Sequence, residues 1–354
     1  AKTGILDTVS MVNYRWSEDI FLKNETISEG KNHGMLIYLD WSGSMAEIMR
    51  DTMDQLLVLV EFCRKVNIPF EVYAFSSASA AHFAGIGVDT SESSYDANFP
   101  QWSMDENENH LAVKSFILLN FLSSTMNKRK FEEALTNLWY LRNSQSSRGW
   151  GENVLNTPYE LGLGSTPLNE AILCATMQVH DFQNANGIQI VNTVFLTDGE
   201  GNTVLPYGHG NNSVMRDPKS RKSVECKGRH QGETDALIRF LREKTGANAI
   251  GIRLHNSKDV SHIYRWSQTV DAVTLGHMNA AFKKNNFVTS PSTSYNESFI
   301  VRGNTELVTD PMDKLPDDAS YARIKSAFSK GGTKRKLSRV IANRMVDIFS
   351  APSN

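Results

Sequence analysis

One short segment limits the possible folds of this chain more than any other. Residues 35–39, Met-Leu-Ile-Tyr-Leu, are followed at once by Asp-Trp-Ser-Gly-Ser at 40–44. A short continuous apolar run that ends in turn-forming residues is typical of a buried strand. In open α/β sheets, ligands bind beyond the carboxyl ends of such strands. The segment therefore predicts a strand that delivers Asp40, Ser42 and Ser44 to a functional edge.

Two later segments carry the same kinds of side chain. Residues 164–168, Gly-Ser-Thr-Pro-Leu, place the hydroxyl of Thr166 on a loop before a predicted helix. Residues 194–200, Val-Phe-Leu-Thr-Asp-Gly-Glu, end a second apolar strand in the carboxylate of Asp198. We expect both segments to meet the first at one edge of a sheet.

This set of carboxylates and hydroxyls suits a small, hard cation. Mg²⁺ takes about six oxygen ligands, usually from one or two carboxylates, neutral oxygens and water, and Mn²⁺ suits the same donors. We predict a Mg²⁺ or Mn²⁺ site whose open corner attracts a carboxylate from a partner. The predicted metal ligands are Asp40, Ser42, Ser44, Thr166 and Asp198.

A simpler interpretation of the first segment needs no metal. Serine is a favoured residue at the start of a helix, and residues 42–44 precede a predicted helix from Met45 to about Val66. In that interpretation Ser42 and Ser44 only cap the helix. A further alternative is a chain that keeps these residues but has lost its affinity for metal.

Together, the pattern Asp40-x-Ser42-x-Ser44, Thr166 and Asp198 resembles the metal-ion-dependent adhesion site of von Willebrand factor A (VWA) domains. The resemblance covers about residues 32–305. It implies an α/β fold with a Rossmann-like, doubly wound, mostly parallel sheet, helical and loop insertions, and a metal ion at the crevice where the strand order reverses.

Within that superfamily the chain is most similar to the intracellular branch typified by the cobaltochelatase subunit that pairs with a MoxR-type AAA+ ATPase, including phage-encoded versions. The resemblance implies an adaptor whose metal ion captures an Asp or Glu of the ATPase or its client. One alternative is a structural interaction component of a large assembly such as a phage particle. Another is a metal-dependent hydrolase that uses Asp40, Asp198 and Glu200.

Catalytic motifs of other classes are missing from the sequence. It contains no Gly-x-x-x-x-Gly-Lys-Ser/Thr phosphate loop, and neither a Gly-x-Ser-x-Gly elbow nor a His-Glu-x-x-His zinc helix. We therefore assign no catalytic residues and expect no catalytic activity from this chain alone. A role as the non-ATPase subunit of a chelatase-like complex stays open.

Composition narrows the setting. A formal charge of −2 and 40% hydrophobic residues indicate a globular protein without the excess positive charge of a nucleic-acid or membrane binder. The three cysteines cannot all pair, and two of them fall inside predicted helices, which favours a reducing compartment. We expect a cytoplasmic protein without a transmembrane segment, with a virion-associated protein as the alternative.

Three regions are expected along the chain: an N-terminal arm at 1–31, the VWA domain at 32–305, and a basic helical tail at 306–354. The domain should contain insertions at about 88–160 and 201–230. We expect the second insertion to be a solvated loop over the metal face, with positive charge that favours an acidic partner. Besides the strand that ends in Asp198, the predicted strands are at 34–40, 69–75, 80–87, 247–254 and 297–302. The predicted helices are at 45–66, 111–123, 128–141, 167–183, 231–245, 258–267 and 273–285.

The helix predicted at 128–141 has two interpretations. It mixes charged and aromatic residues, including Lys128, Arg129 and Lys130, which would suit an interaction face. An ordinary amphipathic helix with Phe131 and Trp139 in the core explains the same pattern.

Overall fold

The computed structural model describes part of the chain in detail. The described residues are 2–6, 21–23, 32–65, 67–77, 111, 116–144, 161–199, 201–205, 212–227, 231–257, 259–264, 270–291 and 294–302. The chain divides into two compact units, of which the first is Ala1–Asn32 and the second begins at His33. In the first unit, β1 (Lys2–Leu6) pairs antiparallel with β2 (Phe21–Lys23). The predicted basic tail at 306–354 lies outside the described residues.

The second unit is built on a seven-stranded sheet with the order β10-β11-β9-β6-β3-β4-β5. Its strands are β3 (His33–Asp40), β4 (Phe70–Ser76), β5 (Ile117–Ser123), β6 (Ile190–Thr197), β9 (Asn248–His255), β10 (Phe287–Thr289) and β11 (Glu297–Arg302). Neighbours from β4 to β11 pair parallel, and β5 and β10 pair antiparallel at the two ends. The predicted α/β fold with a doubly wound, mostly parallel sheet is confirmed.

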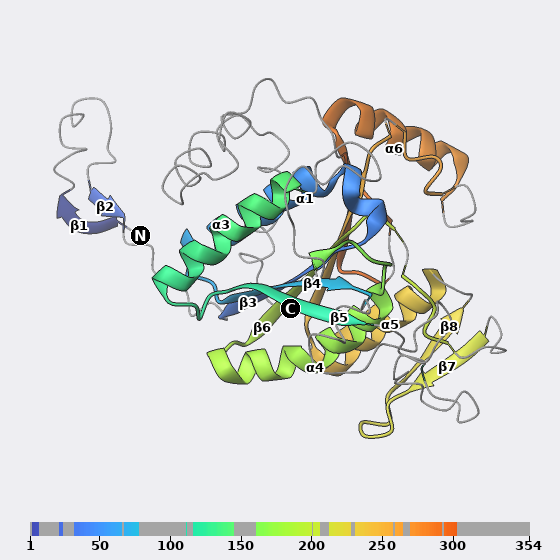
Figure 1. Ribbon diagram of the computed structural model, residues 1–354, viewed down its shortest axis with the longest axis horizontal. Coiled ribbons are helices and arrows are strands. Elements are labelled where there is room, and N and C mark those ends of the chain that lie inside the picture. Colours follow the sequence, from blue (N-terminus) through green and yellow to red (C-terminus); the bar gives the residue numbers. More distant parts are fainter. Residues whose placement is uncertain are drawn as a thin grey trace, which may run out of the picture. The chain divides into compact units, whose positions relative to one another are not determined.

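Helices cover both faces of this sheet. Figure 1 shows α1 (Met49–Lys65) and α3 (Lys128–Ser144) on one side, and α4 (Leu168–Asn186) and α5 (Gln231–Thr245) on the other. A further helix, α6 (Ala272–Asn285), packs against the end of the sheet where β10 and β11 lie. Alternate residues of β3 feed the two cores: Ile37 packs toward α1, and Tyr38 packs toward α4. Burial on both faces explains why residues 35–39 of β3 are apolar without interruption.

The predicted amphipathic character of the helix at 128–141 is confirmed for α3. Phe131, Leu135, Leu138 and Trp139 are buried in the core that α3 shares with α1. Lys128, Arg129 and Lys130 are exposed at the start of the helix. The apolar residues of this helix are therefore used for packing.

The predicted helix at 111–123 is wrong in its second half. Residues Ile117–Ser123 form β5, an antiparallel neighbour of β4. Two polar side chains join β5 to β4. Asn120 Nδ2 and Ser123 Oγ donate to the carboxylate of Glu71 on β4 at 2.8 and 2.6 Å. The strand predicted at 80–87 lies outside the described residues.

The helix predicted at 258–267 is also wrong where it is described. Residues 259–260 are irregular and residues 261–264 form a turn. The backbone N–H of Asp259 donates to Ser257 Oγ, and that of Ser261 donates to the Asp259 carboxylate. Such local bonds from side chains compete with the hydrogen bonds of a helix.

The insertion at 201–230 is not simply a solvated loop over the metal face. It contains a hairpin of β7 (Asn212–Arg216) and β8 (Ser223–Lys227), which buries Met215, Val224 and Cys226 in the core that includes α5. The end of the hairpin lies at the carboxyl end of α5, where Lys222 Nζ donates to the Glu243 carbonyl. Alternating apolar residues, which the sequence contains at 224 and 226, anchor the hairpin to the helix layer.

The cysteines and the helices bear on two expectations from the sequence, a reducing compartment and the lack of a transmembrane segment. None of the three cysteines, Cys63, Cys174 and Cys226, forms a disulfide. Within the described segments, no helix has both the length and the apolar character needed to cross a membrane.

Candidate metal centre

The central strands β3 and β6 bring two of the predicted ligands together. These strands are parallel neighbours, with Tyr38 opposite Phe195 and Leu39 opposite Leu196. Asp40 therefore ends its strand beside Thr197, and Asp198 follows in the next position. The chain continues from β3 toward β4 on one side and from β6 toward β9 on the other. This reversal of strand order is where open α/β sheets bind ligands.

Asp40 is a buried carboxylate that lacks a cationic partner in the described structure. Its side chain is fully buried, and Oδ2 accepts a hydrogen bond from Thr197 Oγ1 at 2.6 Å. Oδ1 is buried and accepts no hydrogen bond from the described residues. Burial raises the pKa of Asp40 to about 7, and the nearby charge of Asp198 adds to this rise, whereas Thr197 and Ser42 oppose it.

The two serines link the strand end to Asp198. Ser42 Oγ lies 3.1 Å from Ser44 Oγ, and Ser44 Oγ donates to Asp198 Oδ1 at 3.1 Å. Adjacent ligands of an octahedral Mg²⁺ ion, bound at about 2.1 Å, lie about 3 Å apart. The spacing of these oxygens thus equals that of neighbouring corners of such an ion's coordination shell.

Helix capping does not account for the hydroxyl of Ser42. Ser42 precedes a 3₁₀ helix, η2 (Gly43–Glu47), and its side chain makes no capping hydrogen bond. The helix predicted from Met45 is divided into η2 and α1, which begins at Met49. The side chain of Ser42 is therefore available for another role.

Strand β9, which neighbours β6 on the side away from β3, holds Asp198 in place. Arg253 Nε of β9 donates to the backbone carbonyl of Asp198 at 3.1 Å. Burial raises the pKa of the Asp198 carboxyl, against the opposing effects of the Ser44 hydroxyl and of Arg253. The arginine binds the backbone of Asp198 and leaves its carboxylate facing Ser44.

The loop that carries Thr166 lies between the loop that follows Asp40 and the loop that follows Asp198. Gly43 N donates to the Gly164 carbonyl at 2.8 Å, and Gly164 N donates to the Trp41 carbonyl at 3.1 Å. On the opposite side, Asn202 N donates to the Thr166 carbonyl at 3.0 Å. The segment that carries Thr166 is thus bonded through its backbone to the segments that carry the other four predicted ligands.

Ser76 and Ser77, at the end of β4, fix the position of this loop. Ser76 Oγ donates to the Trp41 carbonyl at 2.8 Å and lies 3.1 Å from Gly164 N, and Ser77 Oγ accepts from Ser165 N at 2.9 Å. A Cβ atom at Gly164 would lie only 2.4 Å from Ser77 Oγ and 2.6 Å from Ser76 Oγ. These two serines were not among the predicted site residues, although a polar pair at a strand end was a signal for them.

Buried polar side chains hold the loop after Asp198 against α4 and α5. Asn169 Nδ2 donates to the Asn202 carbonyl at 2.7 Å, and Asn169 Oδ1 accepts from Thr234 Oγ1 at 2.7 Å. This network was not predicted either, because Asn169, Asn202 and Thr234 lie far apart in the chain.

Glu233 completes the support of this loop. Its carboxylate accepts hydrogen bonds from Thr203 Oγ1 at 2.7 Å and from Val204 N at 3.0 Å. Glu233 lies in the first turn of α5, where the helix dipole favours negative charge. This acid is therefore committed to structure.

The donors at this edge fit a hard divalent cation. An orphaned buried carboxylate oxygen, a second carboxylate and neighbouring hydroxyls are the ligand types that Mg²⁺ and Mn²⁺ prefer. Among the described residues, no group of three or more His, Cys, Asp or Glu side chains forms a metal site.

No protein-family model matches the sequence, and no curated protein matches it. Among solved structures, the chain is similar to the vWF domain of the type V pili tip protein Mfa5 from Porphyromonas gingivalis, at 7% identity and a TM-score of 0.38, over 92% of this chain and 99% of that one. It is also similar to the D319A mutant of the PilB minor pilin from Streptococcus sanguinis, at 10% identity and a TM-score of 0.36, over 93% and 66% of the two chains.

A third similar structure is the pilus adhesin SpaC from Lactobacillus rhamnosus GG, in its open conformation. The identity is 11% and the TM-score 0.36, over 85% of this chain and 30% of that one. This chain thus corresponds to less than a third of SpaC. At TM-scores below 0.5, these likenesses carry no argument about function.

Proposed function

We propose that this protein binds Mg²⁺ or Mn²⁺ at the carboxyl ends of β3 and β6 and thereby captures an acidic side chain of a partner protein. The observation that carries this proposal is the buried Oδ1 of Asp40, which accepts no hydrogen bond from the described residues. A buried carboxylate is unfavourable unless it is paired or bound to a metal. A divalent cation at this position would remove that penalty.

Asp40 and Asp198 supply the negative charge for the ion, and Ser42, Ser44 and Thr166 supply neutral oxygens. When bound, the ion supplies a positive charge that a carboxylate from outside can approach. The other residues of the edge orient these ligands. Thr197 holds one oxygen of Asp40, and Arg253 holds the backbone of Asp198.

The more specific form of the proposal is an adaptor for a MoxR-type AAA+ ATPase or its client. Its support is the resemblance of the sequence to the cobaltochelatase-associated branch of VWA proteins. The rival form is a structural component of a large assembly, such as a phage particle. We do not extend the proposal to a hydrolase, because its acid-base candidate, Glu200, lies outside the described residues.

A comparison of captured proteins tests the proposal. The tagged full-length protein is incubated with extract in Mg²⁺ or in EDTA, and the bound proteins are identified by mass spectrometry. Three chains are compared: wild type, Asp198→Ala, and the control Asp181→Ala, which removes an exposed carboxylate on α4. We expect specific partners only for wild type and Asp181→Ala in Mg²⁺.

Recovery of an AAA+ ATPase among those partners would support the adaptor form. Recovery of structural proteins in fixed stoichiometry would support the assembly form. If Asp198→Ala captured the same partners as wild type in Mg²⁺, the metal-dependent function would be wrong.

A further inference from the structure

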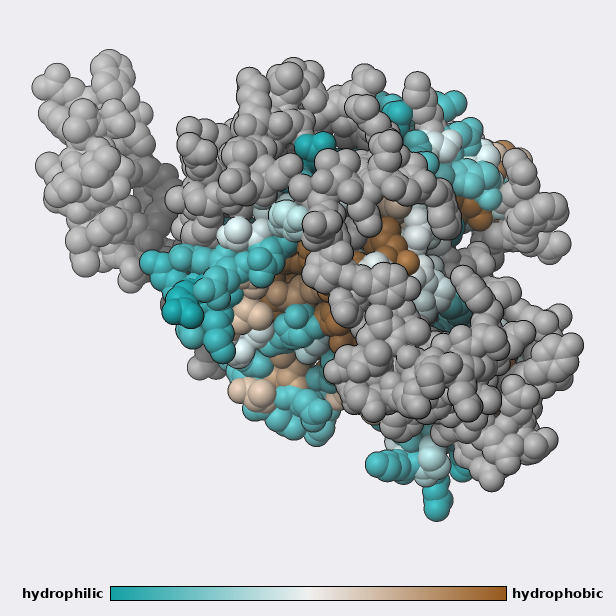
Figure 2. Space-filling view, viewed as in Figure 1, coloured by the Kyte–Doolittle hydropathy of each residue, from teal (hydrophilic) through white to brown (hydrophobic). Residues whose placement is uncertain are grey.

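The turn between β7 and β8 is an unusually basic segment of a chain with a formal charge of −2. Residues 216–222, Arg-Asp-Pro-Lys-Ser-Arg-Lys, contain four cationic residues and one acid. In Figure 2 the same turn forms a hydrophilic protrusion at the lower edge of the molecule. A solvated turn explains polar residues but does not by itself explain this excess of one charge sign.

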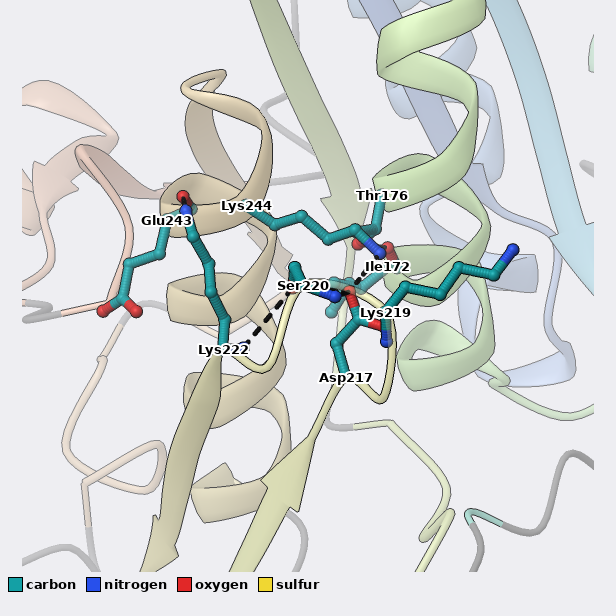
Figure 3. Close-up of polar contacts among 8 residues, drawn as sticks. All are labelled: Ile172, Thr176, Asp217, Lys219, Ser220, Lys222, Glu243 and Lys244. Atoms are coloured by element: carbon teal, nitrogen blue, oxygen red, sulfur yellow. Dashed lines mark hydrogen bonds and ion pairs between the residues drawn. The ribbon is translucent and has the colours of Figure 1, made fainter.

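The turn is held in one conformation by the carboxylate of Asp217. This carboxylate accepts hydrogen bonds from Lys219 N at 3.1 Å, from Ser220 N at 3.3 Å and from Ser220 Oγ at 2.6 Å. It also forms an ion pair with Lys244 Nζ of α5 at 2.9 Å (Figure 3). These donors, the Ser220 hydroxyl first and then Lys244, hold the pKa of Asp217 well below its usual range. The turn is therefore pre-organised.

Some of the cations have structural roles and others do not. Lys222 Nζ donates to the Glu243 carbonyl at the carboxyl end of α5 (Figure 3), and Lys244 neutralises Asp217. Arg216, Lys219 and Arg221 are exposed, and the described structure gives their side chains no ion pair. Figure 3 shows the Lys219 amino group extended away from the Asp217 carboxylate. We call Arg216, Lys219 and Arg221 the basic turn.

The backbone of Arg221 is in the left-handed region, with φ of 59°. Its N–H donates to the Asp217 carbonyl at 2.8 Å, which closes the turn. Glycine or asparagine adopts this conformation more easily than arginine. An arginine at this position is locally unfavourable, and none of the described contacts of its side chain offsets that cost.

The basic turn lies far from the metal centre. The amino end of α5 contacts the loop after Asp198 through Glu233, and the carboxyl end of the same helix contacts the turn through Lys244. A helix with the length of α5 spans about 22 Å. The two sites are therefore at opposite ends of one helix and can bind different groups.

We propose that the basic turn is a second docking site, which binds an acidic segment of a partner protein. Charge complementarity carries this assignment: three exposed cations lie within six residues of one another in the chain, on a turn that Asp217 holds by hydrogen bonds. Beside them, Val214 is 65% exposed on β7, which adds an apolar contact that suits a protein partner. Proteins that bind single-stranded nucleic acid use longer basic grooves with aromatic side chains. This site goes beyond the proposed function, because it requires no metal ion.

The experiment measures binding of a fluorescein-labelled oligoglutamate peptide to the full-length protein by anisotropy, at low salt and in EDTA. The triple variant Arg216→Gln, Lys219→Gln, Arg221→Gln should bind about tenfold more weakly than wild type. The control triple variant Lys128→Gln, Arg129→Gln, Lys130→Gln makes the same change in net charge on exposed residues of α3. It should bind nearly as tightly as wild type.

Three results would overturn the proposal: no measurable binding of the peptide by wild type, equal losses in the two triple variants, or tighter binding of an oligothymidylate of the same charge at the basic turn. The last result would assign the site to nucleic acid. Asp198→Ala should bind the peptide as wild type does, so failure of this site and failure of the metal centre are distinguishable.

A single substitution separates a docking role of Arg221 from a structural one. Arg221→Asn removes the charge and suits the left-handed backbone better. We expect the melting temperature to stay equal or rise while the affinity for the peptide falls. A lower melting temperature with unchanged affinity would show that Arg221 serves the fold alone and would contradict the proposal.

Discussion

Two buried carboxylates in the same domain are treated in different ways. Asp54 on α1 is 4% exposed, and Arg142 of α3 donates to both of its oxygens, at 2.6 and 2.7 Å. Asp40 at the end of β3 is fully buried and accepts a hydrogen bond from Thr197 at Oδ2, while its Oδ1 accepts none from the described residues. Thr197 and Ser42 only partly offset the effect of burial on its pKa.

The contrast distinguishes a structural acid from one that is held ready for a ligand. A buried carboxylate costs free energy unless it is paired and hydrogen-bonded. The chain supplies a guanidinium in the helix layer, and Arg142 also stacks over the ring of Trp139 at 4.5 Å. At the carboxyl end of β3, burial without a cation raises the pKa of Asp40 to about 7. An external cation would play there the part that Arg142 plays for Asp54.

Removing the internal cation should produce the largest effect on stability. Arg142→Ala removes the guanidinium that binds both oxygens of the buried Asp54 carboxylate, so the free energy of unfolding should fall by about 3–5 kcal/mol. Urea denaturation measures this change. The double variant Asp54→Leu, Arg142→Met should recover most of the loss, because well-packed apolar residues replace buried ion pairs at little cost. A loss below about 1 kcal/mol for Arg142→Ala would remove the contrast with Asp40.

Removing the charge at Asp40 should instead raise the free energy of unfolding, by an amount that depends on pH. Burial raises its pKa from 3.8 to about 7. Between these values the folded protein keeps a proton that the unfolded chain has lost, so this group lowers stability as the pH rises from about 4 to about 7. At pH 8 without metal, Asp40→Asn should therefore exceed wild type in free energy of unfolding by at most about 4 kcal/mol.

Mg²⁺ should cancel this advantage, because a bound cation favours the charged carboxylate. Urea denaturation at several pH values, with Mg²⁺ or with EDTA, measures the difference between the two chains. Two results would contradict the role of Asp40 as a metal ligand. One is a difference in free energy of unfolding between the two chains that is the same at every pH, and the other is a difference that Mg²⁺ leaves unchanged.

Gly164→Ala should damage the metal centre through its backbone. The new methyl group would collide with Ser76 Oγ and Ser77 Oγ, and Ser76 is buried and bonded to the Trp41 carbonyl. We expect a loss of about 1–3 kcal/mol in the free energy of unfolding, together with weaker Mg²⁺ binding by calorimetry. Gly199→Ala is the control, because nothing lies within 4 Å of the position of its new Cβ. Equal effects of the two substitutions would contradict the positioning role of Gly164.

Thr166→Ala should have the smallest effect, because it deletes one neutral oxygen. We expect Mg²⁺ affinity to fall by about tenfold, with the free energy of unfolding unchanged. Ser165→Ala removes an exposed hydroxyl from the adjacent position and serves as the control. Calorimetric titration of both variants measures the difference. Unchanged affinity in Thr166→Ala would remove Thr166 from the ligand set.

The central sheet was predictable because its signals are local. The buried parallel strands β3 and β6 each contain a short apolar run, and an acid stands at the end of β3 and directly after the end of β6. The strand β5 was missed because a short apolar run such as 116–119 does not by itself distinguish helix from strand. Its partner, Glu71, is almost 50 residues away in the sequence. A still longer separation, of 88 residues, hid the contact of Ser76 with Gly164.

The ligand types at the candidate centre were also visible in the sequence, as acids and hydroxyls that follow apolar segments. The hydrogen bonds that hold them were not. Arg253 binds the backbone of Asp198 from a different strand, and Asn169 holds the following loop from α4. Such contacts depend on which strands become neighbours, and a single sequence does not encode that choice in any local pattern.

The most direct test of the account is to count bound ions. Mn²⁺ is titrated into the metal-free, full-length protein, and the free ion is followed by electron paramagnetic resonance. Wild type should bind an ion that Mg²⁺ displaces and that both Asp40→Asn and Asp198→Ala fail to bind. Equal Mn²⁺ binding by wild type and the two variants would contradict a metal centre at this edge.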